Sequence, residues 1–271
     1  MAHMFTNAYA YDQFMGRWSR LLAPCLAQFA EIPDCGGKIL DAGCGIGALA
    51  FAIAEFRPLC HIVGIDTSKE YIIYAESRNN YSDRVHFKVG DIQDLAFPDA
   101  AFDNSLSMLV LNFIPNAPRA LSEMRRVTRP GGQVVAAVWD YGDGMEMLRA
   151  FWDAAVAVDA NASRLHERHM PLCRAGELSG LWKSAALENI HEQPLEVEMN
   201  FKSFQDYWEP FLMGQGPAGA YVKHIGHDRL PILREEVKRQ LRLRDETAPF
   251  ILHGRVWAVR GSVPESRNDG N

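Results

Sequence analysis

A glycine-rich turn beside an acid is the part of the sequence best suited to chemistry. A short apolar stretch leads to Asp41 and then to three alternating glycines, Gly43, Gly45 and Gly47. Glycine lets the backbone turn tightly and approach a ligand closely, so a strand, this turn and a following helix can form a nucleotide site. The spacing lacks the two-residue gap of the dinucleotide fingerprint. Because the Asp41 carboxylate would repel a pyrophosphate and attract a cation, the turn favours a positively charged nucleoside.

Two further acids extend this predicted site. Asp66 ends a second apolar run, and Asp91 follows a third. In an open parallel sheet, ligands bind at the carboxyl ends of the strands, so Asp41, Asp66 and Asp91 are predicted to converge on one rim. The Asp66 carboxylate can accept hydrogen bonds from both hydroxyls of a ribose, and Asp91 can accept one from the exocyclic amine of adenine.

The elements that must position these acids alternate along the chain. We predict strands at 38–42, 61–66, 84–89, 102–109, 132–139, 187–199 and 250–260, and helices near 18–31, 46–56, 69–79, 117–128, 144–160 and 175–185. Up to residue 140, strand and helix alternate strictly, which is typical of a parallel sheet that helices cover on both faces.

At these residues the sequence resembles the class I S-adenosylmethionine-dependent methyltransferases of the small-molecule type. Residues 40–47 look like the family's first motif, which holds the methionine part of the cofactor, and 64–68 look like the second, whose acid binds the ribose. Residues 89–92 look like the third, where an aspartate and the next backbone group face the adenine. Further motifs follow in the family's order at 102–103, 106–113 and 123–132. The resemblance is close over residues 9–140.

The resemblance implies both a fold and a cofactor. The expected fold is α/β: a doubly wound, mostly parallel, seven-stranded Rossmann-like sheet with an antiparallel edge strand and a helical lid. The expected cofactor is S-adenosylmethionine. From the core of the fold, it would be bound by Asp41, Gly43, Gly45, Asp66, Thr67, Asp91, Ile92 and Leu109.

The segment 11–20 resembles an N-terminal helix that closes over the cofactor in a subset of these enzymes. Tyr11 could reach the methionine carboxylate through its hydroxyl group, and Arg17 could pair with it. Trp18 could cover the sulfonium by a cation–aromatic contact. The alternative is an amphipathic packing helix whose aromatic residues are core and whose Arg17 lies on the surface.

Methyl transfer by in-line displacement demands mainly alignment, and a general base is needed only if the acceptor must lose a proton. No catalytic residue is assigned. Segments 141–172 and 201–248 are expected to form the lid, which would enclose a small, partly apolar acceptor. Candidate acceptor-facing residues are Asn112, Trp139, His169 and Tyr207. The aromatic stripe of 204, 207, 208 and 211 has helical spacing, which is more typical of core packing than of a pocket.

The expected domain organisation is a cofactor-binding core at 5–140, the two lid insertions, further core elements at 173–200 and 249–262, and a disordered tail at 263–271. A net charge of −6 and a pI near 5.9 argue against nucleic acid as a partner. No apolar run is long enough for a membrane span. Five cysteines without a C-x-x-C pair fit reduced thiols in a cytoplasmic protein and no metal site.

Three questions stay open at the level of sequence. The chain could be a monomer or a homodimer. A nicotinamide-dependent oxidoreductase on a similar sheet is an alternative, although Asp41, the glycine spacing and Asp91 count against it. A non-catalytic module that binds the cofactor for regulation is the other alternative, because methyl transfer often requires no diagnostic catalytic residue.

Overall fold

The computed structural model describes residues 7–33 and 36–265. It contains a seven-stranded sheet in the order β3-β2-β1-β4-β5-β7-β6. The strands are β1 (Gly37–Ala42), β2 (Cys60–Asp66), β3 (Val85–Val89), β4 (Phe102–Met108), β5 (Thr128–Trp139), β6 (Glu188–Phe201) and β7 (Phe250–Ser262). Most of the predicted tail, 266–271, lies outside the described residues.

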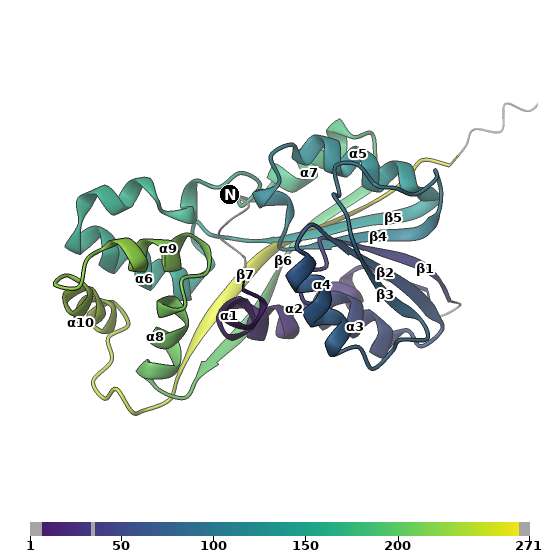
Figure 1. The fold of residues 1–271 in the computed structure, drawn as a ribbon. Helices are drawn as coiled ribbons and strands as arrows, with labels where there is room; N and C mark the ends of the chain where they lie inside the picture. The colour runs from purple at the N-terminus through teal and green to yellow at the C-terminus, as the bar shows by residue number, and fades with distance from the viewer. Residues whose placement is uncertain (1–6, 34–35, 266–271) are drawn as a thin grey trace, which may run out of the picture. The chain divides into compact units, whose positions relative to one another are not determined.

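The first five strands run parallel, and β7 reverses the direction. The pairs β1–β2, β1–β4, β2–β3 and β4–β5 are all parallel. Backbone hydrogen bonds join Gly132 to Val263 near the start of β5 and Asp140 to Arg255 just after its end, so β7 is antiparallel to β5. Figure 1 shows the parallel strands side by side. This arrangement confirms the predicted α/β fold class.

The helices are α1 (Ala8–Tyr11), α2 (Arg17–Phe29), α3 (Ala48–Phe56), α4 (Lys69–Ser77), α5 (Ala117–Val127), α6 (Glu146–Val158), α7 (Glu177–Ser184), α8 (Phe204–Leu212), α9 (Gly216–His224) and α10 (Leu230–Gln240). Helices α2 to α7 fall close to the six ranges predicted from the sequence, and α8, α9 and α10 lie within the segment 201–248 expected to be helical. Local capping fixes several starts. The Ser68 hydroxyl accepts the Tyr71 amide at the start of α4, and the Asn116 side chain accepts the Arg119 amide at the start of α5.

The described chain divides into two compact units. We call the first the sheet unit, which comprises residues 19–33, 36–138, 171–195 and 257–265. The second, the helical unit, comprises residues 7–18, 139–170 and 196–256. The core-and-lid boundaries expected from the sequence stay a prediction.

The core of the sheet unit comes from strands buried on both faces. Such strands read as continuous apolar runs rather than as alternating ones. In β5, residues 134–138 are all buried, and in β1 Ile39 and Leu40 have no exposed surface. Helix α5 packs a buried stripe of side chains against this sheet. The stripe has the spacing of the helical period and consists of Ala120, Leu121, Met124 and Val127.

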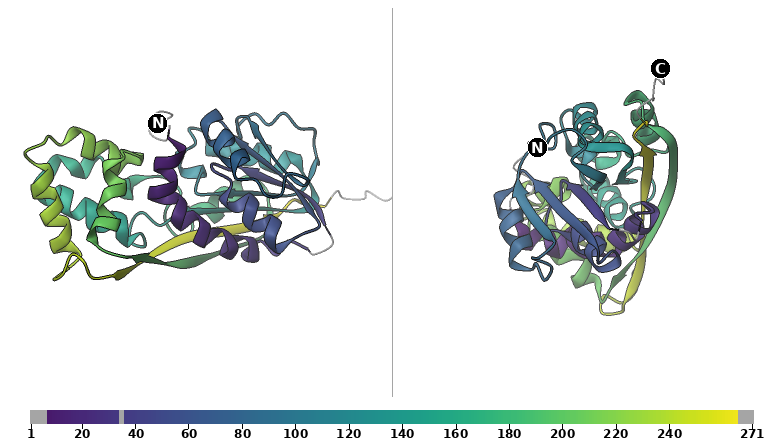
Figure 2. Two further views of the ribbon diagram at one scale, coloured as in Figure 1. Left: turned by 60° about the horizontal axis from the view of Figure 1, so that its bottom comes forward. Right: turned by 90° about the vertical axis from the view of Figure 1, so that its right-hand side faces the viewer.

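The core of the helical unit is aromatic. Phe204, Tyr207, Trp208 and Phe211 are all buried along one side of α8. The rings of Phe151 and Phe211 stack with their centroids 4.6 Å apart. These contacts confirm the interpretation of the stripe as core packing. In Figure 1 and in the left view of Figure 2, α6, α8, α9 and α10 lie next to one another.

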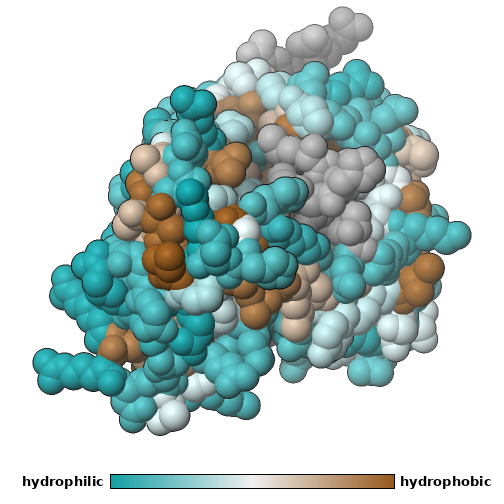
Figure 3. Space-filling view, turned by 60° about the vertical axis from the view of Figure 1, so that its left-hand side comes forward, coloured by the Kyte–Doolittle hydropathy of each residue, from teal (hydrophilic) through white to brown (hydrophobic). Residues whose placement is uncertain are grey.

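The face of the molecule drawn in Figure 3 carries mainly hydrophilic side chains. Apolar residues form separate small patches there, which is normal for a folded protein. None of the helices in 7–33 and 36–265 is long and apolar enough to cross a membrane. The cysteines that the structure describes, Cys25, Cys44, Cys60 and Cys173, are free thiols.

Candidate functional site

The glycine turn after β1 lies at the carboxyl end of the parallel strands. The amides of Gly43 and Cys44 both donate to the Ile65 carbonyl, at 2.7 and 3.0 Å, so the turn is fastened to β2. Gly45 has a positive φ of 53°, and a Cβ atom there would find only Tyr71 within 4 Å, at 4.0 Å. The space in front of Gly45 is therefore open to a ligand that approaches the backbone.

Asp41 is a buried carboxyl group with one unused oxygen. Its Oδ2 accepts the Ala50 amide of α3 at 3.1 Å, and its Oδ1 has no hydrogen-bond partner among the described residues. Burial raises the pKa of Asp41 to about 7, the Ala50 hydrogen bond opposes this, and the charge of Asp66 adds to it. A cation placed beside Asp41 would relieve both the desolvation and the missing bond.

Asp66 ties the glycine turn to the turn after β2. Its Oδ2 accepts the Gly45 amide at 2.9 Å and its Oδ1 accepts the Ser68 amide at 2.8 Å. Burial raises the pKa of Asp66, while these amides and that of Thr67 partly offset the rise. Each carboxylate oxygen can accept more than one hydrogen bond, so Asp66 can still receive the two hydroxyls of a diol.

Asp91 lies in the loop after β3 with its side chain exposed, and the neighbouring Ile92 is buried. The Asp91 carboxylate accepts the Gln93 backbone amide at 2.8 Å and the Gln93 side-chain amide at 3.2 Å. Asp41 and Asp66 thus lie at the carboxyl ends of β1 and β2, and Asp91 lies just after the carboxyl end of the neighbouring β3, all within the sheet unit.

The segment after β4 completes this rim. Leu109 has a φ of 66°, unusual for a residue with a branched side chain, and its amide donates to the Ala137 carbonyl at 2.7 Å. The next residue, Val110, packs directly against Gly43. Asn112 is buried in the short helix η2 (Leu111–Phe113) that follows. Strained backbone of this kind gathers at ligand sites.

Cys44, within the glycine turn, is a packing residue. Its side chain is buried, and burial together with the charges of Asp41 and Asp66 raises the pKa of the thiol well above its usual range. A thiol in this environment does not supply a thiolate. Within the described part of the chain, no three His, Cys, Asp or Glu residues form a group that could hold a metal ion.

The predicted N-terminal ligands Tyr11, Arg17 and Trp18 belong to the helical unit. Arg17 forms a two-pronged ion pair with Asp206, at 2.8 and 3.0 Å, and donates to the Asn200 carbonyl at 2.9 Å. Trp18 is buried against Phe201, with ring centroids 5.0 Å apart. Tyr11 is half-buried and precedes a π-helix, η1 (Asp12–Gly16). Their roles toward a cofactor stay predictions.

The other predicted acceptor residues, which also lie in the helical unit, differ in exposure. Trp139 is buried, and its indole nitrogen has no hydrogen-bond partner among the described residues. Tyr207 is buried and donates to the Met147 carbonyl at 2.8 Å. His169 is exposed in the short helix η4 (Glu167–His169). The structure brings the core cofactor residues and Asn112 into one unit, and these three residues into the other.

Sequence reasoning missed several residues that shape the rim. Val110 packs against Gly43, the Ala50 amide donates to the Asp41 side chain, and Gln93 donates to Asp91. Gln93 had a usable signal, because an aspartate commonly accepts the backbone amide two residues on. Val110 had none, since its contact with Gly43 joins two turns that are distant in the sequence.

The sequence model of a methyltransferase domain family matches residues 33–187. The chain is 34% identical over 146 residues to a malonyl-[acyl-carrier protein] O-methyltransferase from Erwinia billingiae, covering 54% of this chain and 55% of that protein. It is 32% identical over 135 residues to a demethylmenaquinone methyltransferase from Symbiobacterium thermophilum, covering 48% and 53%. It spans about half the length of these curated relatives.

Solved structures with methyltransferase names share the fold. Phosphoethanolamine N-methyltransferase 2 from Haemonchus contortus, in complex with S-adenosyl-L-methionine, superposes with a TM-score of 0.60 at 17% identity, covering 95% of this chain and 57% of that one. A structure described as a putative methyltransferase from Bacillus halodurans gives 0.58 at 17% identity, covering 89% and 98%. At these identities the likeness concerns the fold alone.

Proposed function

The chain belongs to the methyltransferase domain family, whose model spans residues 33–187, and from this premise we propose that it transfers the methyl group of S-adenosylmethionine to a small-molecule acceptor. The names of its relatives support the acceptor class. One is a demethylmenaquinone methyltransferase and another, from Mycolicibacterium smegmatis, is a fatty-acid O-methyltransferase that is 35% identical over 119 residues. Both names describe small acceptors rather than polymers.

The observation that carries the proposal is the unused oxygen of Asp41 beside the open glycine turn. S-Adenosylmethionine bears positive charge on its sulfonium and on its amino group. Such charge stabilises a buried carboxylate that has one oxygen without a hydrogen-bond partner. A dinucleotide would bring pyrophosphate, an anion, to the same place. The residues at the end of β1 therefore fit the proposed cofactor better than they fit a nicotinamide dinucleotide.

The neighbouring acids fit the rest of the cofactor. We assign the ribose hydroxyls to Asp66, whose carboxylate is held in place by two backbone amides. We assign the exocyclic amine of adenine to Asp91, and the adenine ring to the neighbourhood of Ile92 and Leu109. Tyr11, Arg17 and Trp18 remain candidate ligands of the methionine part, and Asn112, Trp139, His169 and Tyr207 remain candidate acceptor residues.

The bound cofactor would supply a methyl group on a good leaving group, so the protein needs mainly to align the reactants. In this mechanism Asp41 would neutralise positive charge on the cofactor, and the turn at Gly43 and Gly45, which is fastened to β2 and Asp66, would present its backbone to it. Asp66 and Asp91 would hold the ribose and the adenine. We assign no general base, because proton removal depends on the acceptor.

Calorimetric titration with S-adenosylmethionine, S-adenosylhomocysteine and NADH tests the proposal. We expect micromolar binding of the first two and none of NADH. Asp66→Ala should weaken both by about ten- to a hundredfold, the cost of one charged hydrogen-bond partner. Asp83→Ala, a change at an exposed aspartate in the same unit, is the matched control. Binding of NADH alone would overturn the proposal and favour the oxidoreductase alternative.

A further inference from the structure

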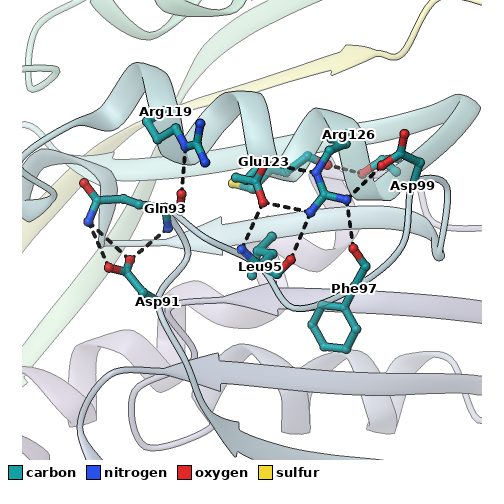
Figure 4. Close-up of polar contacts among 10 residues, drawn as sticks. Asp91, Gln93, Leu95, Phe97, Asp99, Arg119, Glu123 and Arg126 are labelled. Carbon is teal, nitrogen blue, oxygen red and sulfur yellow. Dashed lines mark hydrogen bonds and ion pairs between the residues drawn. The ribbon is translucent and has the colours of Figure 1, made fainter.

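The loop between β3 and β4 is fastened to α5 by side chains that are not among the proposed cofactor ligands. Figure 4 shows these contacts, all of which lie within the sheet unit. Arg126 donates to the Leu95 carbonyl at 2.9 Å and to the Phe97 carbonyl at 2.8 Å, and it pairs with Asp99 at 2.8 Å. One guanidinium group thus holds three points of the loop.

Glu123 holds the same loop from the adjacent turn of α5. It accepts the Leu95 amide at 2.9 Å, while Arg126 donates to it at 2.8 and 2.9 Å. The hydrogen bond from Arg126 is the main reason that the pKa of Glu123 is lowered, so its charge is retained. Both backbone groups of Leu95 are therefore fixed by charged partners, whose hydrogen bonds are among the stronger ones in proteins.

Gln93 connects this fastened loop to Asp91. The Arg119 Nε donates to the Gln93 carbonyl at 2.9 Å, and the Asn116 amide donates to the Gln93 side-chain oxygen at 3.2 Å. Because that oxygen is an acceptor, the other end of the side chain must present its NH₂ group. This NH₂ group faces Asp91 and lies 3.2 Å from both carboxylate oxygens.

We propose that Gln93 is a positioning residue for the cofactor: held by Arg119 and Asn116, it fixes the Asp91 carboxylate in the orientation that receives adenine. The inference rests on the proposed function, since Asp91 is there assigned to the exocyclic amine. An exposed aspartate would otherwise rotate freely, and ordering it on binding would lower affinity. Gln93 donates to Oδ1 through both its backbone and its side-chain amide and to Oδ2 through the side-chain amide alone, so the second acceptor position of Oδ2 is left to the ligand.

The test compares two ligands that differ only at the atom Asp91 would read. S-Adenosylhomocysteine carries the exocyclic amine, and its 6-deamino analogue, whose base is unsubstituted purine, carries a hydrogen atom in its place. We expect the wild-type protein to prefer the adenosyl form by at least about tenfold in calorimetry, as for loss of a charged hydrogen bond. Asp91→Ala should abolish this preference.

Gln93→Glu keeps the size of the side chain and the acceptor for Asn116, but turns a carboxylate toward Asp91. We expect it to lower the affinity for the adenosyl form by about tenfold and to remove most of the preference, because like charges repel. Arg119→Ala should cost about threefold. Arg129→Ala is the matched control and should leave both affinities unchanged. Arg129 pairs with Asp103 near the amino ends of β5 and β4, away from the carboxyl ends where the proposed site lies.

The outcomes separate this inference from the proposed function. A wild-type protein without the preference, or an Asp91→Ala variant that keeps it, would overturn the adenine assignment itself. Suppose instead that Asp91→Ala loses the preference while Gln93→Glu and Arg119→Ala keep the affinity and the preference of the wild type. That result would overturn only the positioning role. In an Asp91→Ala background, Gln93→Glu should cost nothing further, and an additional tenfold loss there would show that Gln93 acts independently of Asp91.

Discussion

Gly43 and Val110 are packed so closely that a Cβ atom on Gly43 would lie 2.6 Å from both γ-carbons of Val110. Gly43 also has a φ of 80°, which disfavours any side chain. Gly43→Ala should therefore destabilise the sheet unit by about 2–4 kcal/mol, as steric overlap and backbone strain add. Denaturant unfolding measures this.

Val110→Ala in the same chain removes both γ-carbons and should recover most of the steric part of that loss, but not the backbone part. A double-mutant cycle measures the recovered part as the coupling free energy between the two positions. Strict additivity of Gly43→Ala and Val110→Ala would contradict the contact between them.

Binding of the cationic cofactor should depend on pH through Asp41. Without ligand the pKa of Asp41 is raised to about 7, and only the ionised carboxylate attracts a cation. The affinity for S-adenosylmethionine should therefore fall as the pH decreases below 7, approaching about tenfold per pH unit. Asp41→Asn should flatten this dependence between pH 5.5 and 7, and Asp83→Ala should keep it. An undiminished slope in Asp41→Asn would exclude Asp41 as its source.

The stability of the protein should also depend on pH through Glu167. This buried carboxyl group accepts a hydrogen bond from the Trp152 indole, and burial raises its pKa from 4.5 to about 7. A raised pKa in the folded state favours the protonated form, so the stability is fully present below pH 4.5 and is lost as the pH rises through 7. The loss attributable to Glu167 should amount to about 3 kcal/mol.

Chemical unfolding of Glu167→Gln between pH 5 and pH 8 measures this contribution. Glutamine keeps an acceptor for Trp152 but does not titrate, so the variant should lose less stability than the wild-type protein as the pH rises. Glu209→Gln, at an exposed position on α8, should behave like the wild type. Parallel curves for all three proteins would rule out Glu167 as the titrating group.

Arg17 and Asp206 should stabilise the helical unit jointly. Their side chains are about one-quarter exposed and share two hydrogen bonds, a better geometry than that of most surface ion pairs. We expect a coupling free energy of about 1 kcal/mol in the cycle of Arg17→Ala and Asp206→Asn. If Arg17 serves the cofactor only through this pair, Asp206→Asn should weaken cofactor binding as much as Arg17→Ala does. A larger effect of Arg17→Ala would favour direct contact.

The parts of the fold that depend on local pattern could be predicted from the sequence. Buried parallel strands can be recognised in the sequence as apolar runs. The acids at the ends of these runs can be assigned to a ligand site, because ligands bind at the carboxyl ends of such strands. The start of β5 could not be placed. It begins at Thr128, ahead of Pro130 and Gly131, because residues between the pairs Phe102–Thr128 and Asn104–Gln133 bulge out of register.

The partners of individual side chains were the harder part. The sequence offers Arg17 as a cation for any nearby anion, and only the folded chain brings Asp206 within 2.8 Å of it. Likewise, Gln93 is one polar residue among several in its loop until Arg119 and Asn116 are placed against it. Such contacts depend on the path of the chain through space, which local propensities do not encode.

The π-helix at Asp12–Gly16 lets the N-terminal segment absorb the loss of one residue. A π-helical turn accommodates one residue more than an α-helical turn. Deleting one residue from these five would therefore restore ordinary helical winding and leave Tyr11 and Trp18 in nearly the same relative orientation around the axis. A deletion in the regular turns of α2 that follow would instead rotate the preceding residues by about 100°, one residue's step in an α-helix. Among natural variants, single-residue deletions should therefore be commoner in these five positions than within α2.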